Sequence, residues 1–129
     1  MSIRITYDEE IDGFVIKASG VVMREDILVS LDEFLNHPKF RQNINQLFDC
    51  TEAFIGLTTQ DLMSVSSYFS SISSQLGHHR KLALVVLGDL NYGIMRQYEA
   101  LFDSGPNVSV SVFKSLSDAR KWLKPADKK

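Results

Sequence analysis

The side chains of this chain that could perform chemistry are few and widely spaced. A single cysteine, Cys50, directly follows Asp49. A cysteine attacks a substrate as its thiolate, which requires a base or a positive charge close by. The neighbouring sequence supplies no such base, so we interpret Cys50 as a small buried apolar residue. We therefore expect no catalytic residue and no enzymatic activity; an enzyme that uses Cys50 or an acidic pair is the least favoured alternative.

The pattern of histidine and acidic residues does not predict a metal site. His78 and His79 are adjacent, so most backbone conformations point them apart, and the i, i+4 histidine spacing of a helical zinc site is missing, as is any C-x-x-C pair. Four acidic residues crowd the segment DEEID at 8–12, which we interpret as a solvated turn. Metal binding by that segment is the weaker alternative. We expect neither a metal nor a cofactor.

Composition limits the partners and the location of the protein. The chain has 129 residues and a net charge of −2, so no overall positive field attracts nucleic acid. Two short basic segments exist, HHRK at 78–81 and KPADKK at 124–129. One cysteine and a charged N-terminus without an apolar run fit a cytoplasmic protein. No apolar stretch approaches the roughly 18 residues that span a bilayer, so a membrane contact would be peripheral, at the inner membrane surface.

The elements that must position these residues follow from hydrophobic periodicity. IRITY and FVIKASG predict a strand hairpin, and MREDILVSLDEFLNHP predicts a helix that Pro38 ends. Three further strands are predicted at 44–50, 81–88 and 107–113, and three further helices at 58–76, 89–105 and 115–124. The order ββαβαβαβα indicates one α/β domain over residues 1–124, with a mixed, mainly parallel sheet of about five strands, four helices and a flexible tail at 125–129.

Three stretches carry a resemblance to a known family: FVIKASGVVMREDI, NQLFDCTEAFIGLTTQDL, and NYGIMRQYEALF followed by VFKSLSDARKWL. Over nearly its whole length the chain resembles the STAS/SEC14-like superfamily, and within it the small stand-alone SpoIIAA-like proteins, which are similar to anti-sigma-factor antagonists. The resemblance implies the STAS/SEC14-like fold and no established enzymatic reaction. The SEC14-type domains imply binding of lipids or other apolar ligands.

The resemblance also implies a regulatory site. In the antagonists, a strand that ends in Asp is followed by a loop and by an Asp-Ser pair whose serine a partner kinase phosphorylates. Counted from Asp49, the matching position falls near Thr58, with Thr59 beside it, whereas Gly56 and Leu57 replace the preceding Asp. Capping of the next helix by Thr58 with Asp61 is the structural alternative.

The helix predicted at 58–76 has an unusual polar face. Its apolar arc predicts core contacts for Leu62, Val65, Phe69, Ile72 and Leu76, with Tyr68 at the edge. The opposite arc carries Met63, Ser67, Ser70 and Ser74, and Asp61 is the only charged residue of the helix. Because no Lys or Glu would have to be desolvated, this face can be covered by a ligand, a partner or a second copy. An ordinary solvated face is the alternative.

Two further groups of residues complete the predicted site. AFIGL at 53–57 is expected to be a loop at a strand end, where Phe54, Ile55 and Leu57 either fold back on the core or contact an apolar ligand. In the helix at 89–105, Leu90, Ile94, Tyr98, Leu101 and Phe102 are expected in the core. Tyr92 and Arg96 lie on the other side, where Arg96 either pairs with Glu99 or binds an anionic head group; the motif Tyr-Gly-x-x-Arg is part of the family pattern.

These observations lead to two hypotheses. The first is a non-enzymatic module that binds an apolar or amphipathic, lipid-like molecule, with Phe54, Ile55, Leu57, Met63 and Tyr68 on its apolar part and Tyr92 and Arg96 on its head group. Peripheral membrane contact would be aided by the HHRK segment. The second is a STAS-type regulatory module that docks a partner protein or a second copy as a homodimer, controlled by phosphorylation of Thr58 or Thr59.

Overall fold

The computed structural model describes residues 2–77, 79–102 and 108–125. Its five strands form a single sheet in the order β1-β2-β3-β4-β5. The first two strands are antiparallel, and every later neighbour is parallel. The strands are β1 (Ser2–Asp8), β2 (Gly13–Val22), β3 (Asn45–Ile55), β4 (Arg80–Val86) and β5 (Val108–Phe113). The predicted mixed, mainly parallel sheet is thus confirmed.

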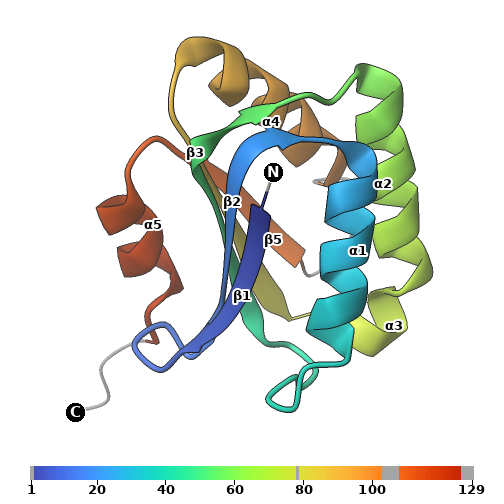
Figure 1. The fold of residues 1–129 in the computed structure, drawn as a ribbon. Coiled ribbons are helices and arrows are strands. Elements are labelled where there is room, and N and C mark those ends of the chain that lie inside the picture. The colour runs from blue at the N-terminus through green and yellow to red at the C-terminus, as the bar shows by residue number, and fades with distance from the viewer. Residues whose placement is uncertain (1, 78, 103–107, 126–129) are drawn as a thin grey trace.

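The helices lie on both faces of this sheet. They are α1 (Arg24–Leu35), α2 (Thr59–Ser71), α3 (Ser73–Leu76), α4 (Asp89–Phe102) and α5 (Leu116–Leu123). Helices α1, α2 and α4 cover one face, and α5 lies alone on the other (Figure 1). Because each strand presents alternate side chains to the two faces, the sheet has two separate apolar clusters, which we call the three-helix face and the α5 face.

The predicted helix at 58–76 is divided in two. The backbone leaves helical geometry at Ile72, which ends α2, and α3 then forms a single short turn. Serines flank this point, and the Ser71 hydroxyl donates to the Tyr68 carbonyl at 2.6 Å. A hydroxyl that bonds a helix carbonyl competes with the backbone ladder, and serine has low helix propensity. The predicted apolar arc is nevertheless buried, from Leu62 through Leu76.

Helix α4 is rotated relative to the predicted orientation. Leu90 is 63% exposed, whereas Asn91, Met95 and Tyr98 are buried. The Asn91 side chain explains the rotation, because it accepts from the Ile55 amide and donates to the Ala53 and Leu87 carbonyls, all at 3.1 Å. These bonds fasten α4 to the ends of β3 and β4. The expected core role of Leu90 is therefore wrong, while the side chains of Leu101 and Phe102 lie outside the described part.

Strand β3 is longer than predicted. It continues through Ile55, so the expected loop at 53–57 is largely strand. The pairing with β2 shifts by one residue between Lys17 and Ser19, which marks a β-bulge on β3 near Cys50 and Thr51. Beyond the last pair with β4, Cys50 with Val86, the strand pairs with β2 as its one described strand neighbour, and the Asn91 side chain of α4 also bonds it. This extension carries Phe54 and Ile55 to the carboxyl edge of the sheet.

Candidate functional site

An internal cavity of about 30 Å³ lies between the sheet and the helices of the three-helix face. By volume it would hold about two water molecules, but its walls are almost entirely apolar, and such voids stay dry. Strand side chains form its floor and helix side chains its roof. The floor includes Ile16, Phe48, Cys50 and Leu84, and the roof includes Ser30, Leu62, Phe69 and Met95.

The sequence creates this space through the size and orientation of particular side chains. Ser30 is the small residue on the buried face of α1, at 3% exposure, and its hydroxyl donates to the Ile27 carbonyl at 2.7 Å. The hydroxyl is thus satisfied within its own helix, and no polar group reaches into the cavity from α1. A larger apolar residue at this position would fill the gap between α1 and the sheet.

A buried positive charge, that of Arg80, lies behind residues that line the cavity, although Arg80 is not itself one of the lining residues. Arg80 is 5% exposed, although it is the first residue of β4. Its Nη1 donates to Gln46 Oε1 at 2.9 Å, and its guanidinium carbon lies 5.6 Å from the centre of the Phe69 ring. Both Gln46 and Phe69 also line the cavity. Burial lowers the pKa of Arg80 to about 10, so the guanidinium remains charged at neutral pH.

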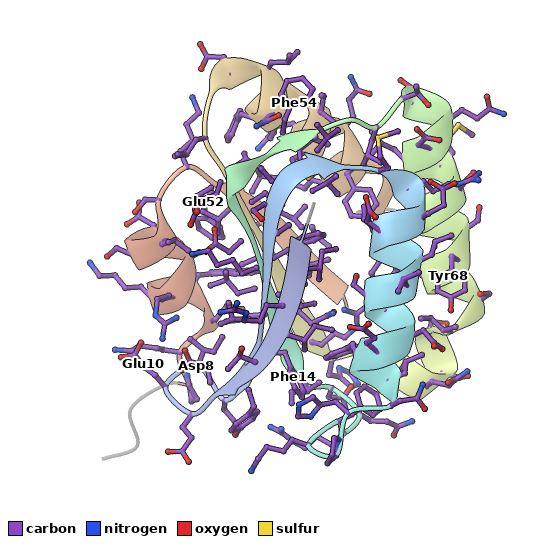
Figure 2. The ribbon with its side chains drawn as sticks, viewed as in Figure 1. Asp8, Glu10, Phe14, Glu52, Phe54 and Tyr68 are labelled. Carbon is purple, nitrogen blue, oxygen red and sulfur yellow. The ribbon has the colours of Figure 1, made fainter. Side chains whose placement is uncertain are left out.

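The residues predicted to meet an apolar ligand do not all gather at this cavity. Ile55 and Leu57 are 2% and 8% exposed and line it. Phe54 and Met63 are about half exposed and do not. Tyr68 is half-buried on α2, and Figure 2 shows it well apart from Phe54 at the end of β3. Phe54 and Ile55 differ because successive strand residues point to opposite faces.

The residues predicted to hold a head group lie away from the cavity lining. The Arg96 guanidinium is exposed and pairs with Glu99 at 3.2 Å, which is the alternative that the sequence left open. The same Glu99 accepts from the Val112 amide at 3.1 Å, so it joins α4 to β5. Tyr92 is half-buried, with Lys114 Nζ 4.6 Å from its ring centre.

The two candidate phosphorylation residues are exposed at the start of α2. Thr58 Oγ1 accepts from the Asp61 amide, and the Asp61 carboxylate accepts from the Thr58 amide, each at 3.0 Å. This reciprocal pair is the predicted helix cap. The Thr59 hydroxyl donates to Gln97 Oε1 at 3.3 Å and thereby connects α2 to α4.

Cys50 is 2% exposed and lines the cavity. Burial, reinforced by the negative charge of neighbouring Asp49, raises the pKa of the thiol to about 12. The thiolate that nucleophilic chemistry needs is therefore almost absent at neutral pH. Cys50 therefore packs in the core as a small apolar side chain.

The segment HHRK does not form the basic surface patch that the sequence suggested. His79 is exposed, but Arg80 is buried, and Lys81 Nζ is bound to the Trp122 carbonyl at 2.9 Å on the α5 face. Alternation along β4 explains this result, because it sends adjacent basic residues to opposite faces. His78 lies outside the described residues.

Acidic residues of the first turn are engaged in ion pairs. Arg120 contacts Asp8 at 2.8 Å and Glu10 at 2.7 Å, and Arg41 contacts Asp12 at 2.8 Å. Figure 2 shows Asp8 and Glu10 together at the turn beneath α5. Across residues 2–77, 79–102 and 108–125, no group of three His, Cys, Asp or Glu side chains is arranged to hold a metal ion.

Exposed apolar side chains gather at the carboxyl ends of the strands. Val21 and Phe54 are register partners at the ends of β2 and β3. Gly56 packs so closely against Val21 and Met23 that a Cβ atom would lie under 3 Å from both. We call this group the strand-end surface; its exposed fractions run from 45% to 63%, and its members are Val21, Met23, Phe54, Leu87 and Leu90.

Sequence reasoning missed Ser30 and Gln46, which line the cavity, and the buried Arg80, which donates to Gln46. The sequence offered two weak indications of these residues. Arg80 is a basic residue at the start of an apolar strand, and Gln46 and Ser30 are polar residues at positions where strand or helix periodicity predicts burial. A search of the described helices finds none that is long and apolar enough to cross a bilayer.

Comparison with known proteins identifies the fold. No family model and no curated protein matches the chain. Among solved structures, it is similar to an uncharacterized protein of the DUF3478 family with a SpoIIAA-like fold from Shewanella loihica PV-4, with 21% sequence identity and a TM-score of 0.57. The match covers 95% of this chain and 92% of that one. At this identity the likeness concerns the fold alone. The chain is therefore a single α/β domain with a SpoIIAA-like fold.

Proposed function

We propose that this protein is a non-enzymatic binding module that holds an apolar or amphipathic small molecule between its sheet and helices α1, α2 and α4. The observation that carries the proposal is the apolar cavity in the middle of the three-helix face. Close-packed interiors contain few voids larger than a water molecule. Ligand sites are typically apolar and have few polar groups that fix orientation, and this cavity has Gln46 and Tyr98 in that position.

A lipid-sized molecule requires a larger space than about 30 Å³, so binding must displace part of the roof. Helix α2 is the element suited to move. Its neighbours are α1 and α4, its outward residues Met63, Ser67 and Ser70 are exposed, and Thr59 with Gln97 supplies its side-chain hydrogen bond to α4. Serine-rich helices have low intrinsic propensity, so their stability depends on the packing that a ligand would replace.

The test uses 1-octanol as a neutral amphipathic probe, followed by methyl chemical shifts in nuclear magnetic resonance spectra. Saturable shifts are expected at the methyl groups of Ile16, Leu62 and Leu84. The Ser30→Leu variant should abolish them, because the added carbons fill the cavity. Ser70→Leu is the matched control, since it makes the same chemical change on the exposed side of α2 and should leave the shifts intact.

Absence of saturable shifts in the wild type would refute the proposal, as would unchanged binding by Ser30→Leu. Native mass spectra of protein purified without detergent provide an independent readout. A retained mass of lipid size supports the binding module and identifies what the cell loads into it.

The strand-end surface supports the peripheral membrane part of this proposal. Charges beside it are paired as Lys17 with Glu52 and Lys114 with Asp89, so we expect insertion of Phe54 and Leu90 rather than attraction by anionic lipid. Flotation with neutral phosphatidylcholine vesicles should recover the wild type but neither Phe54→Asp nor Leu90→Asp. Equal recovery of both variants would remove membrane contact from the proposal.

A regulatory protein-interaction module is the second candidate, favoured by the exposure of Thr58 and Thr59 at the helix start beside the strand-end surface. A phosphate on Thr58 would sit at the N-terminus of α2, where the helix dipole favours negative charge. Mass spectrometry of protein purified from its own cells should then find a phosphate on one of these residues. Unmodified protein under all growth conditions, with a Thr58→Ala variant that changes stability alone, would reject this candidate.

A further inference from the structure

The buried guanidinium of Arg80 has no acidic partner in the described part of the chain. Buried arginines are normally paired with carboxylates, because a charge removed from water is stable only when other charges or hydrogen bonds replace the solvent. Arg80 instead has the neutral Gln46 amide and the Phe69 ring. Its Nε is buried and makes no hydrogen bond within the described residues.

The orientation of Arg80 leaves one side of the guanidinium available. The hydrogen bond to Gln46 uses Nη1. A carboxylate binds a guanidinium most strongly through two parallel N–H···O bonds, and the edge formed by Nε and Nη2 offers such a pair. The aromatic contact with Phe69 holds the planar group in place without consuming these donors.

Arg80 and the cavity share their neighbours. Gln46 and Phe69, which contact Arg80, both line the cavity, and so does Tyr98, whose hydroxyl lies close enough to influence the pKa of Arg80. From that polar edge the lining continues through Leu82 and Leu84 of the same strand to Cys50, and all three are buried. The arrangement is an apolar space whose lining residues Gln46, Phe69 and Tyr98 separate it from the guanidinium of Arg80, so a head group would reach Arg80 by displacing one of them.

We propose that the ligand of this cavity is an apolar monocarboxylic acid, whose carboxylate pairs with Arg80 while its hydrocarbon part lies among the apolar side chains. This inference rests on the proposed function, because it specifies the chemical class of the ligand. One guanidinium balances one negative charge. A phosphate dianion would leave a net negative charge in an apolar interior, which disfavours it.

The test compares probes that share one chain length and differ in the head group: octanoate, 1-octanol and octyl phosphate, measured at pH 7 by isothermal titration calorimetry. At this pH the octanoate carboxyl group is ionised. The wild type should bind octanoate at least about tenfold more tightly than octanol, and octyl phosphate more weakly than octanoate. Equal affinity for octanoate and octanol, or tighter binding of octyl phosphate, would overturn the inference.

Arg80→Met isolates the contribution of the charge, since it keeps an unbranched side chain and removes the guanidinium. The preference for octanoate should disappear, while octanol affinity stays within about twofold. Arg120→Met is the matched control, because it removes an arginine on the α5 face and should keep the preference. A preference that persists in Arg80→Met would overturn the inference.

A second measurement does not depend on folding of the variant. Octanoate labelled with carbon-13 at its carboxyl group, bound to the wild type, should show a carboxyl pKa below that of the free acid, because Arg80 stabilises the carboxylate. An unchanged or raised pKa would overturn the assignment of the head group. If octanol binds and octanoate binds no more tightly, the proposed binding module stands and the carboxylate assignment fails. If neither probe binds, the binding module itself is refuted.

Discussion

The two faces of the sheet are built from the same strands but have different interiors. The α5 face has a small, fully buried cluster that includes Leu47, Ala83, Ala119 and Leu123, all at 0–1% exposure. The three-helix face is larger, has buried aromatic residues in its core and encloses a cavity, whereas the aromatic residues of the α5 face, Phe113 and Trp122, are only partly buried. The α5 face is thus closely packed, whereas the three-helix face contains a small apolar void, at which we propose that a ligand binds.

The two faces also differ in the contacts that their arginines make. Arg120 lies at the edge of the α5 face, where two carboxylates, those of Asp8 and Glu10, contact it. Arg80 lies inside the three-helix face with an amide and an aromatic ring. We interpret the paired Arg120 as a structural contact and propose the buried Arg80 as a binding feature. If the two faces divide support and binding in this way, matched substitutions on them should have different effects.

The largest expected effect comes from truncation of the core on either face. Leu47→Ala on the α5 face and Leu62→Ala on the three-helix face should each lower the free energy of unfolding by about 2–5 kcal/mol, measured by urea denaturation. Both side chains are fully buried. Octanol affinity should rise in Leu62→Ala alone, because that variant enlarges the cavity. The division fails if Leu47→Ala raises the affinity equally.

Helix caps provide a second matched pair. Thr58 caps α2, and Ser115 caps α5 by accepting from the Asp118 amide at 3.3 Å. Each alanine variant should lose about 1 kcal/mol of stability. Only Thr58→Ala should accelerate octanol association in stopped-flow measurements, because it loosens the helix that must move. Equal acceleration by Ser115→Ala would argue against α2 as the moving element.

The ion pair of the α5 face should appear in the pH dependence of stability. The hydrogen bond from Arg120 holds the pKa of Asp8 below its ordinary value of 3.8. A carboxyl group with a lowered pKa in the folded state stabilises the protein above pH 3.8, and this contribution is lost as the pH falls further. The pair is partly exposed, so Arg120→Met should cost about 1 kcal/mol or less at pH 7 and weaken the acid dependence of the urea midpoint.

Arg80→Met should leave that acid dependence unchanged, since no acidic side chain of the described residues faces Arg80. A weakened dependence in this variant would show that Arg80 has an acidic partner in the free protein, and the contrast between the two arginines would be lost.

The smallest effect is expected at Cys50, where the rate of reaction with a thiol reagent reports on opening of the cavity. With the pKa of its thiol raised to about 12, roughly 1 in 100,000 molecules carries the thiolate at pH 7. Native protein should react with a thiol reagent far more slowly than protein in urea, and octanoate should slow the reaction further. The exposed cysteine of Ser70→Cys in a Cys50→Ser background is the control for reagent access. Rapid labelling of native Cys50 would contradict a closed cavity.

Much of the fold was predictable because it depends on local periodicity. The apolar arc of α2 and the strand alternation that places β4 in the core are properties of residues close in sequence. The orientation of α4 was not predictable in this way. It depends on Asn91, a polar residue whose partners Ile55 and Ala53, at the end of β3, lie 36 and 38 positions away in the sequence.

The candidate site was predictable only in part, and for a related reason. Ile55 and Leu57 do line the cavity, whereas Tyr92 and Arg96 of α4, the head-group residues that the sequence suggested, do not. The buried Arg80 was not predicted as a site residue. An exposed arginine and a buried one look alike in a sequence. Whether β4 begins with a solvated basic residue or an interior charge depends on Gln46 and Phe69, which lie 34 and 11 positions away.

The sequence by itself determined the order of the elements, the alternating faces of the strands and the helix cap at Thr58, since each follows from the preferences of neighbouring residues. Only the tertiary structure decided where a cavity remains and which charge is buried near its lining. Packing density and burial are set by residues that are distant in the chain, and the small side chain of Ser30 is one of those that line the space. The apolar cavity and Arg80 are therefore features of the assembled domain.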